Sequence, residues 1–326
     1  MIISATPLRI SFFGGGTDLK EFYKLDGGAV LSTAINKYIY VTVNKKFDEH
    51  IRVSYSKTEN VQKVEEVKHD LVREAMKLTG ADQGIELTTI ADIPAQGTGL
   101  ASSSAFTVGV LHALHAYRGK HVSAEILARQ SCKIEIDILD EPIGKQDQYI
   151  VAFGGLQFIQ FNKDGSVFIN PIICGKRIKE ELQSNFMLFY TGMTRRANTI
   201  LSEQKANSSG KKLNELRVLK ELAFRSKKIL EIDKNPDQFG FLLDESWKVK
   251  KSLASGISNP KIDGFYNAAK KAGALGGKIL GAGGGGFLLL YVPARKKKNV
   301  RAALAVLKEM PFCFEQQGSK IIYFQE

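Results

Sequence analysis

The sequence predicts an α+β protein of two domains, and three observations carry that prediction. The chain has 326 residues, which is too long for one small core and suits domains of roughly 100 to 200 residues each. Residues 7–13 and 37–47 alternate apolar with polar side chains or are β-branched, as strands are. The second half of the chain mixes short apolar runs with helical spacing, the pattern of an antiparallel sheet covered by helices.

The first half is expected to open with two strands on either side of a glycine-rich turn at residues 14–16. Helical spacing runs over 66–80 and ends at Gly80, a natural helix C-cap. The remaining expected elements are a strand over 84–94, a helix after the serines at 102–104 through about Tyr117, a helix over 123–141 that stops before Pro142, a glycine-bounded connection over 141–155 and a strand over 156–161.

The second half is expected to begin with a strand over 186–192 and a long charged helical region from about 195 to 232. The later expected elements are a helix around Trp247, a helix over 262–273, a glycine loop between a short and a buried strand within 276–292, a helix over 295–310 and a final strand over 320–325. The sequence has no clear linker between its halves. We place the two domains at residues 1–175 and 176–326.

The composition, with 44% hydrophobic and 25% charged residues, is that of an ordinary globular protein. The longest apolar run, residues 286–292, is far shorter than the roughly 20 residues of a membrane helix, and the N-terminus does not resemble a secretory signal. Cys132, Cys174 and Cys313 are widely spaced, which argues against a disulfide framework and a zinc site. We therefore expect a cytoplasmic protein with no membrane partner.

The net charge of +12 raises the local concentration of anionic partners. Nucleic acids, nucleotides and phosphorylated metabolites are all anionic, so the charge permits phosphate chemistry without selecting one kind. The lysine runs at 211–212 and 296–298 lack interleaved aromatic residues, and we expect them to be solvated surface. An RNA-binding protein is an alternative that would show strong, salt-dependent affinity, but it leaves the glycine loops unexplained.

The stretch at 94–111, PAQGTGLASSSAFTVGVL, places very small residues where a helix is expected to start. Small side chains leave backbone N–H groups uncovered, and a helix N-terminus adds four unpaired donors and about half a positive charge. These features make an anion site, most often for phosphate. A turn followed by a serine N-cap is the structural alternative.

Three well-known phosphate-binding motifs do not match any stretch of the chain in the required context. A P-loop needs Gly-Lys followed by Ser or Thr, and Gly277-Lys278 is followed by Ile279. The GAGGGG letters at 281–286 precede an expected strand, whereas a dinucleotide-binding fingerprint opens a helix. The set of protein-kinase motifs is absent.

Four stretches in order resemble the GHMP kinases, the superfamily of galactokinase, homoserine kinase, mevalonate kinase and phosphomevalonate kinase. They are PLRISFFGGGTD at 7–18, PAQGTGLASSSA at 94–105, Glu135 followed by GKQDQ at 144–148, and KILGAGGGGF at 278–287. The resemblance covers nearly the whole chain. It implies a ribosomal S5-like N-terminal domain, a ferredoxin-like C-terminal domain and ATP in the crevice between them.

The resemblance implies that ATP and Mg²⁺ bind beside the serine-rich stretch. The residues expected to cradle the ATP phosphates are Gly97, Gly99, Leu100, Ala101, Ser102, Ser103 and Ser104. Many members of the superfamily have Gly where Ala101 stands. The implied magnesium ligands are Ser103 and Glu135, oxygen donors of the kind that Mg²⁺ takes. Without the resemblance, Glu135 would be assigned to a solvated helix position, with Ile134 and Ile138 marking the buried stripe.

The same resemblance implies two catalytic residues. Asp147 matches the carboxylate that accepts the proton of the sugar hydroxyl, or orients that hydroxyl, during phosphoryl transfer. Arg9 matches the basic residue that stabilises this carboxylate and offsets charge in the transition state. The structural alternatives are a loop cap for Asp147 and a strand-end surface charge for Arg9.

The implied substrate residues lie in three places. Asp18 matches an acid that binds sugar hydroxyls, with Gly16 and Thr17 before it, although Asp18 also suits a helix N-cap. Gly284 belongs to the loop that would close over the site. Thr194 and Arg195 suit a substrate phosphate at a helix start. Further candidates are Lys250, Lys251 and Lys278.

Four stretches resemble the branch of sugar kinases that act on heptose 7-phosphate: RISFFGGGTD, GKQDQYIVAFGG, YTGMTRRA and GALGGKILGAGGGGF. The expected reaction is ATP-dependent phosphorylation of D-glycero-D-manno-heptose 7-phosphate at its anomeric hydroxyl to the 1,7-bisphosphate. The expected partner is therefore a sugar phosphate and not nucleic acid, and the oligomeric state is left open. The alternatives are a fucokinase- or galactokinase-type enzyme for an unphosphorylated sugar, and a non-catalytic sugar or nucleotide sensor on the same fold.

Overall fold

The computed structural model describes residues 1–93, 97–193, 197–208, 210, 212–232 and 235–325. Within these residues, the larger of two sheets has eight strands. Their order is β12-β1-β2-β5-β3-β4, while β6 pairs with β2 and carries β7. The bounds are β1 Ile2–Phe13, β2 Gly28–Lys45, β3 Ile51–Ser54, β4 Thr58–Val61, β5 Ile85–Ala91, β6 Leu156–Phe161, β7 Val167–Pro171 and β12 Lys320–Phe324.

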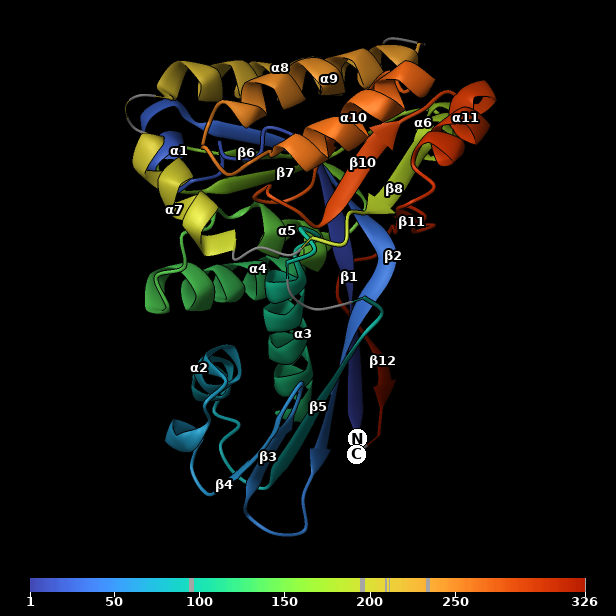
Figure 1. Ribbon diagram of the computed structural model, residues 1–326. Helices are drawn as coiled ribbons and strands as arrows, with labels where there is room; N and C mark the ends of the chain where they lie inside the picture. The colour runs from blue at the N-terminus through green and yellow to red at the C-terminus, as the bar shows by residue number, and fades with distance from the viewer. Residues whose placement is uncertain (94–96, 194–196, 209, 211, 233–234, 326) are drawn as a thin grey trace.

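Helices cover this sheet, and α3 lies against β1 and β2 along its length (Figure 1). The N-terminal helices are α1 Lys20–Asp26, α2 Asp70–Thr79, α3 Ser102–Tyr117, α4 Ala124–Cys132 and α5 Gln146–Phe153, with a 3-10 turn at Val64–Glu66. A π-helical turn, Lys133–Ile138, continues α4. The glycine-bounded connection predicted over 141–155 is therefore wrong at residues 146–153, because the apolar positions of α5 pack into the core between Gly144 and Gly154.

The smaller sheet has four antiparallel strands in the part of the chain that the structure describes. In spatial order they are β11 Lys308–Glu309, β8 Phe186–Tyr190, β10 Phe287–Tyr291 and β9 Gly276–Ile279. Helices α8, α9 and α10 lie together above the sheets in the view of Figure 1. The helices of this half are α6 Lys176–Asn185, α7 Ala197–Asn207, α8 Leu213–Glu231, α9 Asp237–Lys251, α10 Pro260–Ala272 and α11 Lys297–Ala303, with a 3-10 turn at Ala294–Lys296.

Two expectations for the second half need correction, and the predicted final strand is confirmed but belongs to the larger sheet. The helical region predicted over 195–232 is divided into α7 and α8. The helix predicted over 295–310 is shorter, because the chain leaves α11 to pair β11 with β8. The last strand, β12, pairs with β1, so the end of the chain returns to the larger sheet and the two termini lie side by side (Figure 1). The division into residues 1–175 and 176–326 stays a prediction.

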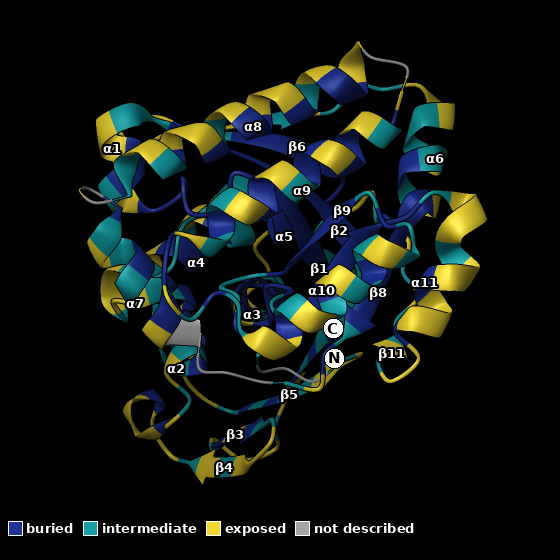
Figure 2. Cartoon of the chain, turned by 45° about the horizontal axis from the view of Figure 1, so that its top comes forward, coloured by how far each residue is buried: buried dark blue, intermediate teal, exposed yellow. Residues whose placement is uncertain are grey.

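An aromatic cluster joins the two sheets. Phe12 of β1 stacks on Phe186 of β8, with ring centroids 5.0 Å apart, and meets Phe239 of α9 edge to face at 5.4 Å. All three rings are buried, and Figure 2 shows β1, β2 and β8 in the buried colour beneath partly exposed helices. Burial of a large aromatic side chain stabilises a fold by about 1.5–3 kcal/mol. This cluster therefore fixes the position of β1 relative to the second half, and the functional cavity lies beside it.

Candidate active site

A cavity lies where β1, the glycine turn after it and the start of α5 meet α9 and the glycine loop after β9. Five charged side chains line it: Arg9, Asp18, Asp147, Lys250 and Lys278. They come from parts of the chain up to 269 positions apart in sequence, so only the fold brings them together. With every group ionised, three cations face two carboxylates, and the lining carries a net charge of +1.

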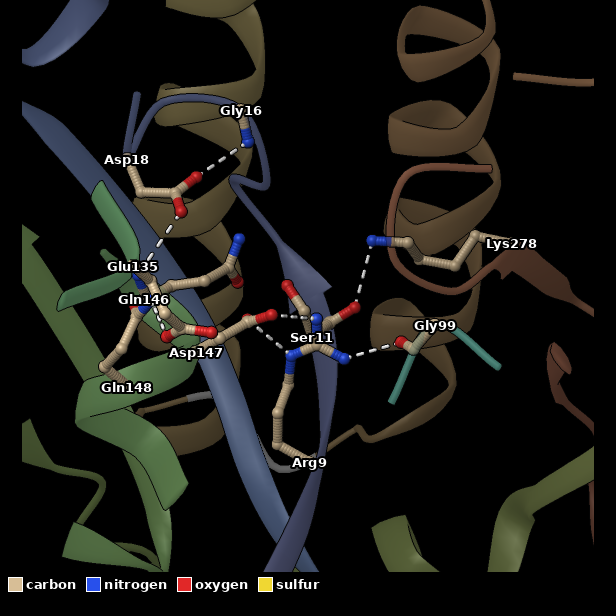
Figure 3. Close-up of polar contacts among 10 residues, drawn as sticks. All are labelled: Arg9, Ser11, Gly16, Asp18, Gly99, Glu135, Gln146, Asp147, Gln148 and Lys278. Carbon is tan, nitrogen blue, oxygen red and sulfur yellow. Dashed lines mark hydrogen bonds and ion pairs between the residues drawn. The ribbon is translucent and has the colours of Figure 1, made fainter. Parts of the chain in front are cut away.

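Arg9 and Asp147 form a two-point ion pair. The Arg9 Nε and Nη2 atoms each donate to one oxygen of Asp147 at 2.8 Å (Figure 3). The Arg9 Nη1 atom also donates to the carbonyl of Gly99 at 2.6 Å. Arg9 is buried, whereas the side chain of Asp147 is 24% exposed, so one face of the carboxylate is open to a ligand. A bidentate pair of this kind holds both partners in a fixed orientation.

The first turn of α3 has no side-chain cap. Its N-cap is Ala101, which has a left-handed φ of 65° and no side chain able to cap the helix. The first backbone N–H groups of a helix have no partner within it, so those at 102–104 are available to an anion. Gly97 and Gly99 also have positive φ values. The structural alternative, a turn closed by a serine N-cap, is wrong because Ser102 lies inside the helix.

The glycine loop after β9 packs directly on the serine-rich stretch. A Cβ atom on Gly99 would lie 2.4 Å from the carbonyl oxygen of Leu280, and one on Gly286 would lie 2.5 Å from that of Thr98. The Phe287 N–H also donates to the Thr98 carbonyl at 3.3 Å. Glycine is thus required at both positions, because the two backbones touch. Gly284 donates its N–H to Ile257 at 2.9 Å, and Gly281 and Ala282 are the loop residues that line the cavity.

Glu135 lies in the π-helical turn and is fully buried. Its Oε1 accepts a hydrogen bond from Ser103 Oγ at 2.6 Å, and its Oε2 accepts bonds from Gln148 at 2.7 Å and Ser131 at 3.2 Å. Burial raises the pKa of Glu135, and the bonds from Ser103 and Gln148 oppose that shift. The wider π-helical turn changes the register of the helix. Ile138 is consequently 45% exposed, so the buried stripe predicted through it is wrong.

The Ser103 and Glu135 pair fits a magnesium site by its chemistry. Both are oxygen donors, they are adjacent, and Ser103 sits in the first turn of α3, where phosphate oxygens are expected. Among the described residues there is no cluster of three or more His, Cys, Asp or Glu side chains that could hold a metal. Phosphate oxygens and water would therefore supply the other ligands of the ion.

Asp18 is buried, and both of its carboxylate oxygens accept backbone bonds. Gly16 N–H donates to Oδ1 at 2.9 Å, and Gln146 N–H donates to Oδ2 at 3.3 Å (Figure 3). Asp18 does not cap α1, whose N-cap is Leu19. Burial raises the pKa of Asp18, and the negative charge of Asp147 adds to this effect. A Cβ on Gly144 would lie 2.0 Å from Asp18 Oδ2, so glycine at that position makes room for the carboxylate.

Of the residues predicted to contact the substrate, Thr17 and Lys251 do not line the cavity. Thr17 is fully buried, and its hydroxyl exchanges hydrogen bonds with the backbone of Ala29 on β2. Thr194 and Arg195 lie outside the described residues. Lys251 bonds to Asp263 at 3.1 Å and does not line the cavity.

Sequence reasoning missed three polar residues of the cavity wall: Ser11, Gln146 and Gln204. Each has a buried polar atom without a partner among the described residues. Ser11 could have been found, because it is two residues after Arg9 on the same face of a strand. Gln204 carries no sequence signal, since a glutamine in a polar helix is ordinary surface.

Two family models match the chain. The model of the GHMP kinases N terminal domain matches residues 64–155, and that of the GHMP kinases C terminal matches residues 219–309. This chain belongs to the GHMP kinase family. It is therefore an ATP-dependent kinase, and the predicted α+β GHMP architecture is confirmed.

Individual relatives of this GHMP kinase cover at least 93% of the chain. It is 32% identical to the D-glycero-alpha-D-manno-heptose 7-phosphate kinase of Campylobacter jejuni, over 98% of both chains. The crystal structure of a D-glycero-D-manno-heptose 1-phosphate kinase from Bacteroides thetaiotaomicron matches with a TM-score of 0.82 and 26% identity over 100% of both chains. A bifunctional L-fucokinase/L-fucose-1-P guanylyltransferase of Bacteroides fragilis is 26% identical over 93% of this chain and 35% of that longer protein. No helix in the described residues combines the length and apolar character of a membrane span.

Proposed function

We propose that this GHMP kinase transfers the γ-phosphoryl group of ATP to the anomeric hydroxyl of D-glycero-D-manno-heptose 7-phosphate, giving the 1,7-bisphosphate and ADP. The observation that carries the proposal is the Arg9–Asp147 pair, which joins the cavity to the open helix end of α3 through Gly99. Phosphoryl transfer uses a group that orients or deprotonates the attacking hydroxyl and positive charge close to the transferred phosphoryl group, and this pair offers a carboxylate and a guanidinium for these two tasks. We propose that the reaction takes place in the cytoplasm.

In the proposed reaction, different residues bind ATP, deprotonate or orient the hydroxyl, and stabilise charge. The N–H groups at the start of α3 hold the ATP phosphates. Asp147 accepts or orients the proton of the anomeric hydroxyl, whose oxygen forms the new bond to phosphorus as the bond to the ADP oxygen breaks. Arg9 keeps Asp147 in place and offsets negative charge as it develops.

Ser103 and Glu135 would hold Mg²⁺, which neutralises charge on the ATP phosphates when bound. Asp18, held by Gly16 and Gln146, offers a carboxylate oxygen to sugar hydroxyls. Gly16, which lines the cavity, would form part of the wall of the substrate site, whereas Thr17 and Gly284 would act only through the turn and the loop that contain them.

Two features support a phosphorylated substrate. The names of the relatives from Campylobacter jejuni and Bacteroides thetaiotaomicron both specify a heptose phosphate, although they differ in the position of the phosphate. In the sequence, Thr194 is followed directly by Arg195, and hydroxyl and guanidinium groups are common phosphate ligands. The similarity to the fucokinase supports the second candidate, a kinase for an unphosphorylated sugar.

A substrate panel tests the proposal. The purified enzyme is given MgATP with heptose 7-phosphate, heptose 1-phosphate, heptose, fucose or galactose, and ADP release is measured. We expect the highest kcat/KM with heptose 7-phosphate. A preference for an unphosphorylated sugar would replace the proposal with the second candidate, and absence of turnover with every sugar, despite ATP binding, would favour a sensor.

A further inference from the structure

Two lysines are buried in the cavity wall, and neither forms an ion pair with Asp18, a carboxylate that shares the cavity with them. Lys250, in the last turn of α9, is 6% exposed, and Lys278, on β9, is 5% exposed. Within the described residues, neither forms an ion pair; their acceptors are neutral. Lys250 donates to the Gly15 carbonyl at 3.0 Å and to Gln204 at 3.1 Å, and Lys278 donates to the carbonyls of Ser11 and Phe12 at 2.9 and 3.1 Å. An unpaired buried ammonium is costly, so the arrangement calls for an anion.

The same wall presents unused hydrogen-bond donors. An ammonium group has three N–H donors, and the described residues supply two acceptors to each lysine. The Ser11 hydroxyl and the Gln204 side-chain nitrogen are buried, line the cavity and have no partner among the described residues. The wall therefore offers up to four donors, two of them on cations, to one ligand group.

The lysines lie away from the phosphate-transfer end of the cavity. Arg9 contacts Gly99 at the start of α3, whereas Lys278 contacts β1 at Ser11 and Phe12, and Lys250 contacts Gly15 beyond the strand. Because a strand rises about 3.3 Å per residue, Ser11 is about 7 Å further along β1 than Arg9. In Figure 3 the Lys278 ammonium lies on the opposite side of Ser11 from Asp147. A sugar with its reacting hydroxyl at Asp147 would thus direct its far end toward the lysines.

We propose that Lys250 and Lys278 bind the phosphate group that the substrate already carries, and so select a sugar phosphate over the unphosphorylated sugar. The inference rests on the proposed function and assigns its specificity to the cavity wall. Ser11 and Gln204 donate to the same phosphate. Any contribution from Arg195 would add to that of the lysines.

The charges around the lysines explain how an anion is bound. Lys278 faces Lys250 of α9, Arg9 of β1 and Asp18 of the glycine turn, and Asp147 of α5 lines the same cavity. Burial lowers the pKa of Lys278 to about 7, with Lys250 and Arg9 adding to the shift, and burial lowers the pKa of Lys250 to about 8. A phosphate dianion favours the charged forms of both lysines. The binding of a phosphate dianion at pH 8 should therefore be accompanied by proton uptake by the protein.

Variants of the two lysines test the proposal. Lys250→Met and Lys278→Met keep side-chain length and remove the charge, and Lys251→Met on the same helix is the matched control. With heptose 7-phosphate, we expect each cavity variant to lower kcat/KM by about 10- to 150-fold, the range for a lost charge-assisted hydrogen bond. With unphosphorylated heptose, the change should stay within about threefold, and the KM for ATP should not move.

Equal losses with both sugars, or a loss confined to ATP, would overturn the lysine assignment and leave the proposed function in place. If the wild-type enzyme does not phosphorylate heptose 7-phosphate, that result would instead contradict the proposed function.

Calorimetry on the wild type tests the site without relying on the folding of a variant. Inorganic phosphate is titrated at pH 8 in two buffers with different ionisation enthalpies. We expect proton uptake on binding, and competition between inorganic phosphate and heptose 7-phosphate. Binding without proton uptake, or no competition, would overturn the inference.

Discussion

The two ends of the cavity are built in different ways. At the α3 end, the groups proposed to bind ATP belong mostly to the backbone: N–H donors of a helix start and glycines that let two loops touch, with one ion pair beside them. At the α9 end, side chains from four elements converge, among them Asp18, Gln204, Lys250 and Lys278. ATP is common to the GHMP kinases, whereas the acceptor differs between a heptose phosphate kinase, a fucokinase and a mevalonate kinase. Side chains can change to suit a new acceptor without moving the backbone.

The strongest test of this division is Asp147→Asn, which keeps the side-chain size and removes the proton acceptor at the junction of the two ends. We expect kcat to fall by roughly 100-fold or more, with the dissociation constant for ATP nearly unchanged. Asp137→Asn, on an exposed position of the π-helical turn, is the matched control. Near-normal turnover by a folded Asp147→Asn enzyme would remove Asp147 from the mechanism.

Arg195→Ala sharpens the comparison on the substrate side. If Arg195 pairs with the substrate phosphate, kcat/KM for heptose 7-phosphate should fall by about 10- to 150-fold, because a charge-assisted bond is lost. The loss with unphosphorylated heptose should be much smaller, and the KM for ATP should stay constant. Equal losses with the two sugars would assign Arg195 to ATP or to the fold.

Glu135→Gln probes the metal at the ATP end. The amide keeps the size of the side chain but binds Mg²⁺ poorly, so the Mg²⁺ concentration for half-maximal rate should rise by about tenfold or more. Ser131→Ala is the control, because Ser131 donates to Glu135 and is not an expected ligand. A magnesium titration identical to that of the wild type would show that Glu135 is not a ligand.

The smallest expected effect is a difference of a few kcal/mol or less in unfolding free energy between two glycine variants. Gly99→Ala puts a Cβ against Leu280, whereas Gly119→Ala, after the other end of α3, meets nothing within 4 Å; both have positive φ. The shared backbone strain costs roughly 1–2 kcal/mol in the free energy of unfolding, and the clash adds to it only at Gly99. Thermal unfolding and ATP affinity measure the difference. Equal behaviour of the two variants would mean that the loops need not touch.

The sequence by itself determined the ATP end of this protein. Glycine spacing, the serines before an apolar helix and the order of four stretches are local signals, because a helix start and a tight turn are made from neighbouring residues. The long β-rich opening and the glycine loop after β9 were predicted for the same reason. The resemblance to a known family supplied the roles proposed for Arg9, Asp147 and Glu135.

Only the tertiary structure decided the substrate end. Residues such as Ser11, Gln204 and Lys278 come from separate elements, and no spacing in the chain relates them. The burial of Glu135 depends on a π-helical turn. Strand β12 pairs with β1 in the first sheet, although the whole second half of the sequence precedes it. Desolvation is also a property of the folded molecule: it lowers the pKa of Lys278 to about 7, whereas the sequence marks Lys278 only as a candidate and says nothing of its burial.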